Sequence, residues 1–280
     1  MRKLVTELKG FDNLYYEICN EPYFGGVTLD WQRHIANVIS ETETGLGVRH
    51  LISQNIANGG ARVENPHPAV SIFNFHYASP PDTVALNFEL NRVIGDNETG
   101  FRGTNNAPYR MEAWDFILAG GGLFNNLDYS FTAGHEDGSF AYPATQPGGG
   151  NPVFRRQVRF LSETIKRFDF VRMRPDPKAV RADLPAGATL QALVEPGRAY
   201  LVYLHSAIGR SKTEPQPRRK FGLGELSLEV TLPAGEFSAE WADPKTGRTI
   251  DATRLTSRGG PQKLKAPAFE EDILLAVRRR

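Results

Sequence analysis

The chain has 280 residues, and its 33 Lys and Arg side chains nearly balance its 32 Asp and Glu side chains. This balance excludes a nucleic-acid-binding domain that works through bulk positive charge, because such domains carry a clear basic excess. Apolar residues at 40% and charged residues at 23% are typical of a folded globular chain, which excludes wholesale disorder. No apolar run approaches the roughly 18 residues of a membrane span, so no membrane partner is expected.

The first ten residues, MRKLVTELKG, meet Glu7 and Lys9 before any apolar stretch develops, unlike a secretory signal. As written, the chain is therefore expected to be soluble and cytoplasmic unless a segment upstream is missing. The single cysteine, Cys19, cannot form an internal disulfide and is expected to be a small buried apolar residue.

Residues 1 to about 171 alternate short β-like runs with amphipathic stretches, the pattern of consecutive β/α units around a parallel sheet. Strands are predicted over 14–19, 49–54, 69–75, 92–96 and 123–129. Helices are predicted over 29–42, after Pro80-Pro81-Asp82, over 107–119 and over 153–168. The glycine-rich stretch 147–150 lacks a preceding strand and a Lys-Ser/Thr pair, so it predicts a surface loop and not a phosphate cradle.

The composition changes near residue 172, where residues 172–177 predict a linker. Beyond it, strands are predicted over 200–205, 226–232, 237–241 and 272–277, with turns at 233–235 and 243–247. The chain thus divides into residues 1–171 and a small all-β, sandwich-like domain over 172–280.

Functional groups of parallel β/α architectures lie where strands end and the following loops begin. The residues that this rule selects are, in chain order, Glu21, His76, Tyr77, Asp96, Glu98, Asp128 and Tyr129. Among them, Asp96 is expected to be a hydrogen-bonded structural acid. Two carboxylates on different strand ends, with aromatic residues beside them, are what glycosidic bond cleavage requires. One donates a proton to the leaving oxygen, and the other attacks the sugar or activates water. A carboxyl separation of about 5–5.5 Å indicates retention, and one of roughly 6.5–9.5 Å indicates inversion.

The run Leu14 to Pro22, LYYEICNEP, closely resembles the fourth-strand signature of clan A glycoside hydrolases, particularly cellulase-like family 5 enzymes. The resemblance implies that Glu21 is the acid/base and that Asn20 contacts the sugar 2-hydroxyl. Residues 95–101, GDNETGF, are similar to the seventh strand of that family, and two β/α units separate the two motifs as in the family's barrel. Glu98 is then the nucleophile, which implies a retaining mechanism on a carbohydrate substrate, with no cofactor and no metal.

The resemblance covers residues 1–171 and implies a partial (β/α)8 TIM barrel, strands four to eight, in an α/β chain. Residues 74–77, NFHY, look like the sixth strand and imply substrate contacts for His76 and Tyr77, although Tyr77 stands one place early and Ala78 occupies the family's Tyr position. The family's eighth strand often supplies a Trp platform, which residues 127–133 lack, so Tyr129 or Phe131 is expected to take its place.

If Asn-Glu-Pro closes strand four, strands one to three are absent, and an N-terminally truncated barrel is expected. An open parallel sheet leaves unpaired edges, which predicts self-association through the open edge. Glu17 is expected on the same face as Glu21, one layer deeper. A buried carboxylate needs a partner, so we hypothesise a basic partner for Glu17 on an absent strand.

Residues 240–247 and 272–275 resemble the β-domain, sometimes labelled collagen-binding, that follows such barrels in several bacterial proteins, although nothing in these residues supports the label. Glu136 and Asp137 are expected to form a solvated turn, because no further acidic spacing supports a metal loop. The family's usual location is secreted or periplasmic, and the chain carries no address for it. Three functions stay open: a retaining glycoside hydrolase, an inactive truncated fragment of one, or a carbohydrate-binding or interaction protein.

Overall fold

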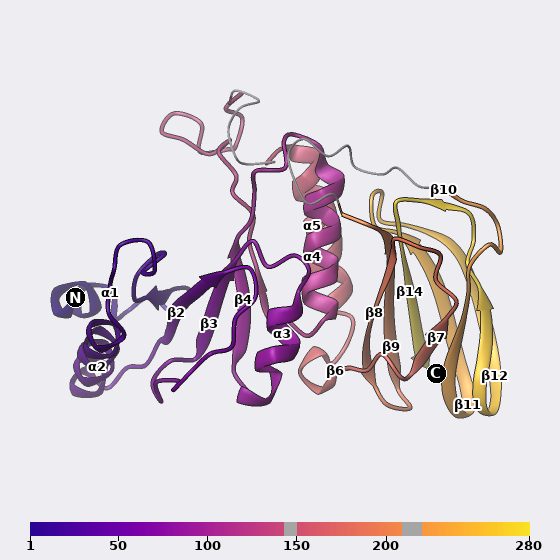
Figure 1. The fold of residues 1–280 in the computed structure, drawn as a ribbon, viewed down its shortest axis with the longest axis horizontal. Helices are drawn as coiled ribbons and strands as arrows, with labels where there is room; N and C mark the ends of the chain where they lie inside the picture. Colours follow the sequence, from indigo (N-terminus) through magenta and orange to yellow (C-terminus); the bar gives the residue numbers. More distant parts are fainter. Residues whose placement is uncertain (143–149, 209–219) are drawn as a thin grey trace. The chain divides into compact units, whose positions relative to one another are not determined.

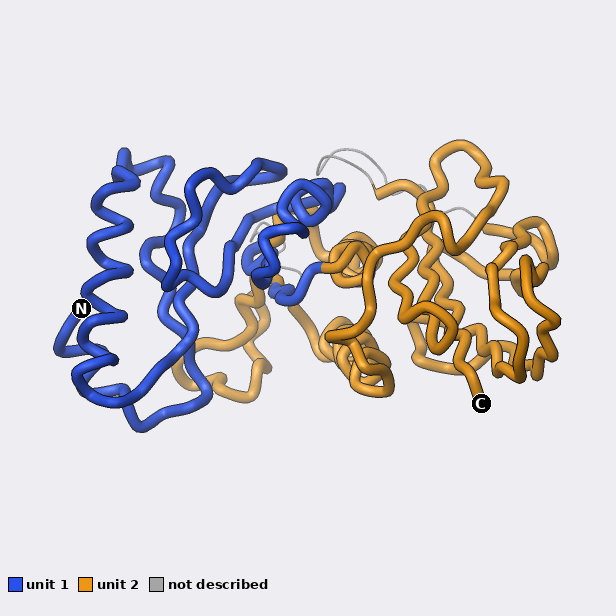
Figure 2. Tube along the Cα trace, turned by 90° about the horizontal axis from the view of Figure 1, so that it is seen from below, with its two compact units in different colours: residues 1–98, 121–125 blue, residues 99–120, 126–280 orange. Residues whose placement is uncertain are grey.

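A computed structural model of the chain describes residues 1–142, 150–208 and 220–280, so most of the predicted loop at 147–150 lies outside the described residues. The chain folds into two compact units, drawn in different colours in Figure 2. Unit 1 comprises residues 1–98 and 121–125, and unit 2 comprises residues 99–120 and 126–280. In the part of the chain that is described, no helix combines the length and hydrophobicity needed to cross a membrane.

Unit 1 is built on a parallel half-barrel sheet whose strands follow one another in space as they do in sequence (Figure 1). The strands are β1 (Tyr15–Glu17), β2 (Leu51–Asn58), β3 (Ile72–His76), β4 (Val93–Glu98) and β5 (Leu123–Phe124). Every neighbouring pair is parallel. All five predicted strands of this region are confirmed, although the first and last are shorter than predicted. The α/β fold class is therefore confirmed.

Three α-helices belong to unit 1: α1 (Arg2–Leu8), α2 (Leu29–Leu46) and α3 (Asp82–Asn87), the last followed by a 3-10 turn, η1 (Phe88–Leu90). Helix α2 begins after Thr28, whose hydroxyl accepts the Trp31 amide at 3.2 Å, and ends at Gly47 in the left-handed conformation. Helices α1 and α2 pack on each other. The core of the unit is formed by buried apolar side chains that include Ile39, Ile52, Phe73, Phe75 and Ile94.

Unit 2 contains the antiparallel part of the chain. Its strands are β6 (Arg174–Pro175), β7 (Val180–Ala182), β8 (Ala188–Glu195), β9 (Ala199–Ser206), β10 (Lys220–Phe221), β11 (Ser227–Asp243), β12 (Arg248–Lys265), β13 (Phe269–Glu270) and β14 (Asp272–Arg279). The main sheet has the order β12-β11-β14-β9-β8-β6, with β7 paired to the start of β11, and β10 pairs with β13. One apolar core lies against these strands, with Val202, Leu228, Phe237, Trp241 and Ile273 among its members.

The hairpin of β11 and β12 differs from the sequence prediction in two ways. The predicted turn at 233–235 is wrong, because β11 continues through Pro233 and pairs with β12 on both sides of it. Strand β12 was not predicted, since most of its side chains are exposed and show no alternation of buried and exposed residues. The turn at 243–247 is confirmed, and the Asp243 carboxylate accepts the Lys245 amide and the Thr246 hydroxyl, both at 2.8 Å.

Helices α4 (Asn106–Leu118) and α5 (Pro152–Ile165) belong to unit 2, which also contains a 3-10 turn, η2 (Phe170–Arg172). Each helix begins with an asparagine cap: Asn105 accepts the Ala107 amide at 3.1 Å, and Asn151 accepts the Phe154 amide at 2.9 Å. Helix α4 is buried along most of its length and packs against β8, β9 and α5.

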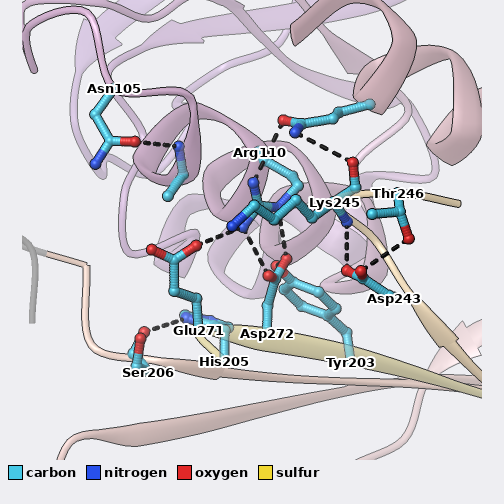
Figure 3. Close-up of polar contacts among 12 residues, drawn as sticks. Asn105, Arg110, Tyr203, His205, Ser206, Asp243, Lys245, Thr246, Glu271 and Asp272 are labelled. Atoms are coloured by element: carbon cyan, nitrogen blue, oxygen red, sulfur yellow. Dashed lines mark hydrogen bonds and ion pairs between the residues drawn. The ribbon is translucent and has the colours of Figure 1, made fainter. Parts of the chain in front are cut away.

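A buried ionic cluster fixes α4 to the antiparallel sheet (Figure 3). The Arg110 guanidinium donates through Nε and Nη2 to both oxygens of Asp272, at 2.9 and 2.8 Å, and through Nη2 to Glu271 at 3.0 Å. Asp272 also accepts the Tyr203 hydroxyl at 2.8 Å. The Trp114 ring stacks on the Tyr203 ring, with centroids 5.6 Å apart. Because every charge in this cluster is paired and hydrogen-bonded, its burial is tolerated.

We expect Arg110→Ala to lower the free energy of unfolding of unit 2 by about 3–5 kcal/mol, because it leaves Asp272 and Glu271 buried without their cation. Chemical denaturation of the full chain, followed by Trp fluorescence, measures this change. The matched control is Arg159→Ala on α5, where the arginine is exposed and pairs with Glu163 four residues on, for an expected loss below about 0.5 kcal/mol. Equal losses for the two variants would contradict a structural role for the cluster.

A second buried pair lies in unit 1, where His50 follows α2. Its Nδ1 lies 2.5 Å from Glu43 Oε1, and its Nε2 lies 2.7 Å from the carbonyl oxygen of Phe11. Both ring nitrogens thus face acceptors, an arrangement that only the protonated imidazolium can satisfy with two donated hydrogens. The hydrogen bond to Glu43 is the main cause that raises the pKa of His50, against the opposing effect of burial.

A raised histidine pKa stabilises the fold below the unfolded-state pKa of about 6.5, and the contribution is lost as pH rises through the folded-state pKa. We therefore expect the free energy of unfolding of unit 1 to fall from pH 6 to pH 9, by an amount on the order of one charged hydrogen bond, about 1.5–3 kcal/mol. In His50→Gln this fall should disappear, and in the exposed control His34→Gln it should persist. Urea titrations at several pH values measure it, and an unchanged slope in His50→Gln would refute the assignment.

Candidate functional site

The carboxyl ends of β1, β3 and β4 bring three of the predicted site residues together within unit 1. Nδ1 of His76 lies 3.2 Å from Glu21 Oε1 and 3.7 Å from Glu98 Oε2. One donor atom from each of the three residues lies within 4.8 Å of the other two. The two acids, far apart in sequence, therefore share one small region at the end of the sheet.

The backbone at Glu21 is set by a contact from the neighbouring strand. Glu21 has a φ of 42°, in the left-handed region that non-glycine residues rarely adopt. Its amide donates to Oδ1 of the buried Asn55 on β2 at 3.0 Å. Strand β2 has a register shift at this point, between Asn55 and Ala57. Such strain is maintained where the surroundings hold the backbone, and it is common at functional sites.

Tyr77 is held against Glu98 in a similar way. Its φ is 55°, its amide donates to the Glu98 carbonyl oxygen at 2.9 Å, and its hydroxyl donates to Glu98 Oε1 at 2.5 Å. Burial and then the Glu98 carboxylate raise the pKa of Tyr77 well above its usual range. Tyr77 therefore stays a hydrogen-bond donor to Glu98 at neutral pH, although its place in the sequence is one residue early.

The site is open to solvent on the side of the acids. The His76 side chain is fully buried, whereas the side chains of Glu21 and Glu98 are 25% and 23% exposed. Tyr23, which the sequence analysis missed, follows Pro22 in the same loop, and its hydroxyl donates to Asn58 Oδ1 at 2.5 Å. Burial, and next the charge of Glu21, raise the pKa of Tyr23. Its place two residues after Glu21 was the sequence signal that could have identified it.

The remaining predicted residues lie in different surroundings. Asn20 is exposed beside Glu21. Asp96 is buried and its Oδ2 accepts the Ala78 amide at 3.1 Å, which confirms it as a hydrogen-bonded structural acid. Tyr129 belongs to unit 2, where it is exposed and its ring centroid lies 6.5 Å from that of Tyr142, so its predicted contact with sugar stays a prediction. Cys19 is half-buried, less than predicted, and forms no disulfide.

A layer of polar side chains lies on the face of the sheet that carries Glu17. Oε2 of Glu17 accepts from the Asn74 amide at 2.6 Å, the Asn97 amide at 2.9 Å and the Ser53 hydroxyl at 3.1 Å. Ser53 and Asn74 also bond to each other. These donors come one each from β2, β3 and β4, and all are neutral. Three donated hydrogens thus solvate the charge of Glu17 within the described residues, and the hypothesis of a basic partner on an absent strand stays a prediction.

Gly95 on β4 makes room for this layer. A Cβ atom at position 95 would collide with Oδ1 of Asn74 and would lie 3.1 Å from a methyl carbon of Leu123. Asn74 is fully buried and is held by its two donated bonds, so it cannot simply turn away. The glycine is thus required by the close approach of the polar layer to the β4 backbone.

Across the residues that the structure describes, Glu21, His76 and Glu98 are the one group of three whose donor atoms are close enough to hold a metal ion. The loop with Glu136 and Asp137 forms a solvated turn as predicted. There, Glu136 accepts the Gly134 amide and Asp137 accepts the Ser139 amide, both at 3.0 Å.

We expect Glu17→Ala to lower the free energy of unfolding of unit 1 by about 1–3 kcal/mol, because it leaves the donors of Ser53, Asn74 and Asn97 without their acceptor. The control is Glu7→Ala on α1, where the carboxylate is exposed and bonds to Lys3, so the expected change is a few tenths of a kcal/mol. Urea denaturation of both variants measures the two changes. An unchanged free energy of unfolding in Glu17→Ala would contradict a stabilising role for the polar layer.

Comparison with known proteins identifies the fold. No protein-family model matches the chain, and no curated protein matches it. A solved structure described as a glycoside hydrolase aligns over 99% of this chain and 67% of its own, with a TM-score of 0.70 and 13% identity. A glycoside hydrolase family 5 structure from Bacteroides vulgatus ATCC 8482 aligns over 99% of this chain and 65% of its own, with a TM-score of 0.69 and 14% identity. The chain thus has the fold of these glycoside hydrolases and spans about two thirds of their length.

Proposed function

We propose that the chain carries the catalytic acids of a retaining glycoside hydrolase that cleaves O-glycosidic bonds of an oligo- or polysaccharide. The observation that carries the proposal is the convergence of Glu21 and Glu98 at the ends of β1 and β4, where both carboxylates are partly exposed. Similarity to solved glycoside hydrolases supports it at the level of the fold.

The closest approach of the two acids is compatible with retention. Their nearest donor oxygens lie within 4.8 Å of each other, and an inverting enzyme needs roughly 6.5–9.5 Å between carboxyl groups to admit a water molecule. A separation of about 5–5.5 Å suits direct attack on the sugar by one carboxylate. The close approach of these two oxygens is compatible with the covalent, two-step route, and the similarity of residues 95–101 to the family's nucleophile strand is what supports it.

In the first step, Glu98 attacks the anomeric carbon, the bond to the leaving oxygen breaks, and Glu21 donates its proton to that oxygen. In the second step, Glu21 takes a proton from water, the water oxygen attacks the anomeric carbon, and Glu98 leaves. The Tyr77 hydroxyl bonds to Oε1 of Glu98 and holds the carboxylate in one orientation. His76 bonds to Glu21 and fixes the position of the acid/base.

The other parts of the proposal concern substrate contacts and organisation. Asn20 and Tyr129 are proposed to contact the sugar together with His76 and Tyr77. The division into a barrel portion over 1–171 and an accessory β-domain over 172–280 stays a prediction, since the two compact units describe packing and not separate folding. Self-association through an open sheet edge and a location outside the cytoplasm also stay predictions.

A mechanism-based 2-fluoro glycosyl fluoride tests the nucleophile directly. We expect it to add one sugar to Glu98, identified by peptide mass spectrometry, when a panel of sugars is offered to the folded full chain. Glu98→Gln should lower kcat/KM on activated aryl glycosides by about 10²- to 10⁴-fold or more. The exposed Glu89→Gln on η1 is the matched control and should keep full activity.

Leaving-group dependence tests the acid/base. Glu21→Gln should lose far less activity on a dinitrophenyl glycoside than on an unactivated disaccharide, because a good leaving group departs without a proton. Equal losses on both substrates would contradict the role given to Glu21. If a folded chain takes no label from any sugar of the panel and hydrolyses none, the proposal fails, and calorimetric sugar binding without turnover would indicate a carbohydrate-binding protein.

A further inference from the structure

The group formed by Glu21, His76 and Glu98 has a second chemical property besides its two acids. It presents one imidazole nitrogen and two carboxylate oxygens, all within 4.8 Å of one another, at the end of a rigid sheet. Nitrogen and oxygen donors of these kinds are the ligands of Zn²⁺ and similar divalent metals. The arrangement therefore resembles three corners of a metal-binding tetrahedron.

The distances suit such an ion. Zinc bonds of about 2.0–2.2 Å at tetrahedral angles place neighbouring ligand atoms about 3.3–3.6 Å apart. His76 Nδ1 lies 3.2 Å from Glu21 Oε1 and 3.7 Å from Glu98 Oε2. The two carboxylate oxygens lie within 4.8 Å of each other, and both belong to side chains with rotatable ends that can adjust to an ion. The fourth position would face solvent, since the two acids are the exposed members of the group.

The surroundings orient two of the three ligands. The His76 ring is fully buried with Nδ1 directed at both acids. The Tyr77 hydroxyl holds Oε1 of Glu98, and the other oxygen, Oε2, is the one nearest His76. Hydrogen bonds of this kind from a neighbouring group position metal ligands in proteins. The site is thus organised on the side of β3 and β4 before any ion arrives.

Charge and burial favour a weakly held ion over a permanent one. Two carboxylates share one histidine as ion-pair partner, so a dication would neutralise both. Nε2 of His76 is buried and has no hydrogen-bond partner among the described residues. In tightly bound metal sites the other ring nitrogen of a ligating histidine normally donates to a carboxylate, a carbonyl or water, and the lack of such an acceptor lowers the expected affinity.

We propose that Glu21, His76 and Glu98 bind a divalent transition metal, with Zn²⁺ as the representative ion, at the place where the sugar would react. The bound ion ties up the proton donor and the nucleophile together, so it inhibits hydrolysis in competition with substrate. The inhibitory part rests on the proposed function, and the binding part does not.

Calorimetry of the full chain with ZnCl₂ at pH 7 tests the binding part. We expect one equivalent of Zn²⁺ to bind, with an affinity lowered at least tenfold in each of Glu21→Gln, His76→Gln and Glu98→Gln. The matched controls His34→Gln and Glu89→Gln should bind as the unchanged chain does. Cys19→Ser is a third control, because a free thiol two residues before Glu21 in the sequence is itself a zinc ligand. Circular dichroism of every variant checks that it is folded, and Tyr77→Phe, which keeps all three ligands, should weaken binding to a smaller extent.

The outcomes separate this inference from the proposed function. Absence of binding below millimolar Zn²⁺, or binding that the three ligand variants leave unchanged, overturns the metal site even if the chain hydrolyses glycosides. Binding at this site in a chain without hydrolysis sustains the metal site and counts against the proposed function. Where hydrolysis is present, Zn²⁺ should raise KM with little change in kcat, and a chelator should reverse the effect. Unchanged kinetics at saturating Zn²⁺ would refute the inhibition.

Discussion

The candidate site depends on one constraint, the parallel pairing of each strand with the next along the series β1, β2, β3 and β4. Because these strands run in one direction and follow one another in space, their carboxyl ends lie at one edge, and Glu21, His76 and Glu98 meet there. Strand direction alone would bring them only to the same edge. The register shifts at Asn55 and His76, together with the left-handed backbone at Glu21 and Tyr77, turn the side chains toward a common point. The sheet topology therefore brings the three residues to one edge, and the local backbone conformation directs their side chains toward one another.

Hydrogen bonds between polar side chains link the parallel strands near this edge. Glu17 takes one neutral donor from each of the next three strands, so its charge links the strands across their shared face. This solution differs from a salt bridge, because the three described donors to Glu17 carry no charge. Close packing is the condition for it, since Asn74 reaches Glu17 only because Gly95 leaves space beside the β4 backbone. The donors of this layer all reach an acceptor, whereas the side-chain oxygens of Asn74 and Asn97 are buried without a donor among the described residues, so the layer is only partly satisfied.

Sequence reasoning recovered the features that local patterns encode and missed those set by distant partners. The five parallel strands, most of the helices and the acids at the strand ends follow from periodicity, caps and the Asn-Glu-Pro motif. The contact of Tyr77 with Glu98 follows a register shift between Phe75 and His76, and no residue type in the sequence predicts such a shift. The attachment of α4 to the antiparallel sheet depends on Arg110 and Asp272, 162 positions apart, and an arginine in a helix usually indicates an exposed face. Strand β12 had no apolar alternation to reveal it, because most of its side chains are exposed, and its register is set by pairing with β11 in the hairpin.

The same arrangement that suits acid catalysis also creates the proposed affinity for a cation. Two carboxylates at short distance repel each other unless one is protonated or a positive charge lies between them. A glycosidase uses the first solution, because the shared proton is what the leaving oxygen receives. His76 offers the second, since its ring nitrogen can donate to Glu21 when protonated and can coordinate a metal when neutral. If both proposals hold, a sugar and a metal ion compete for the same two carboxylates, beside a histidine that solvent does not reach.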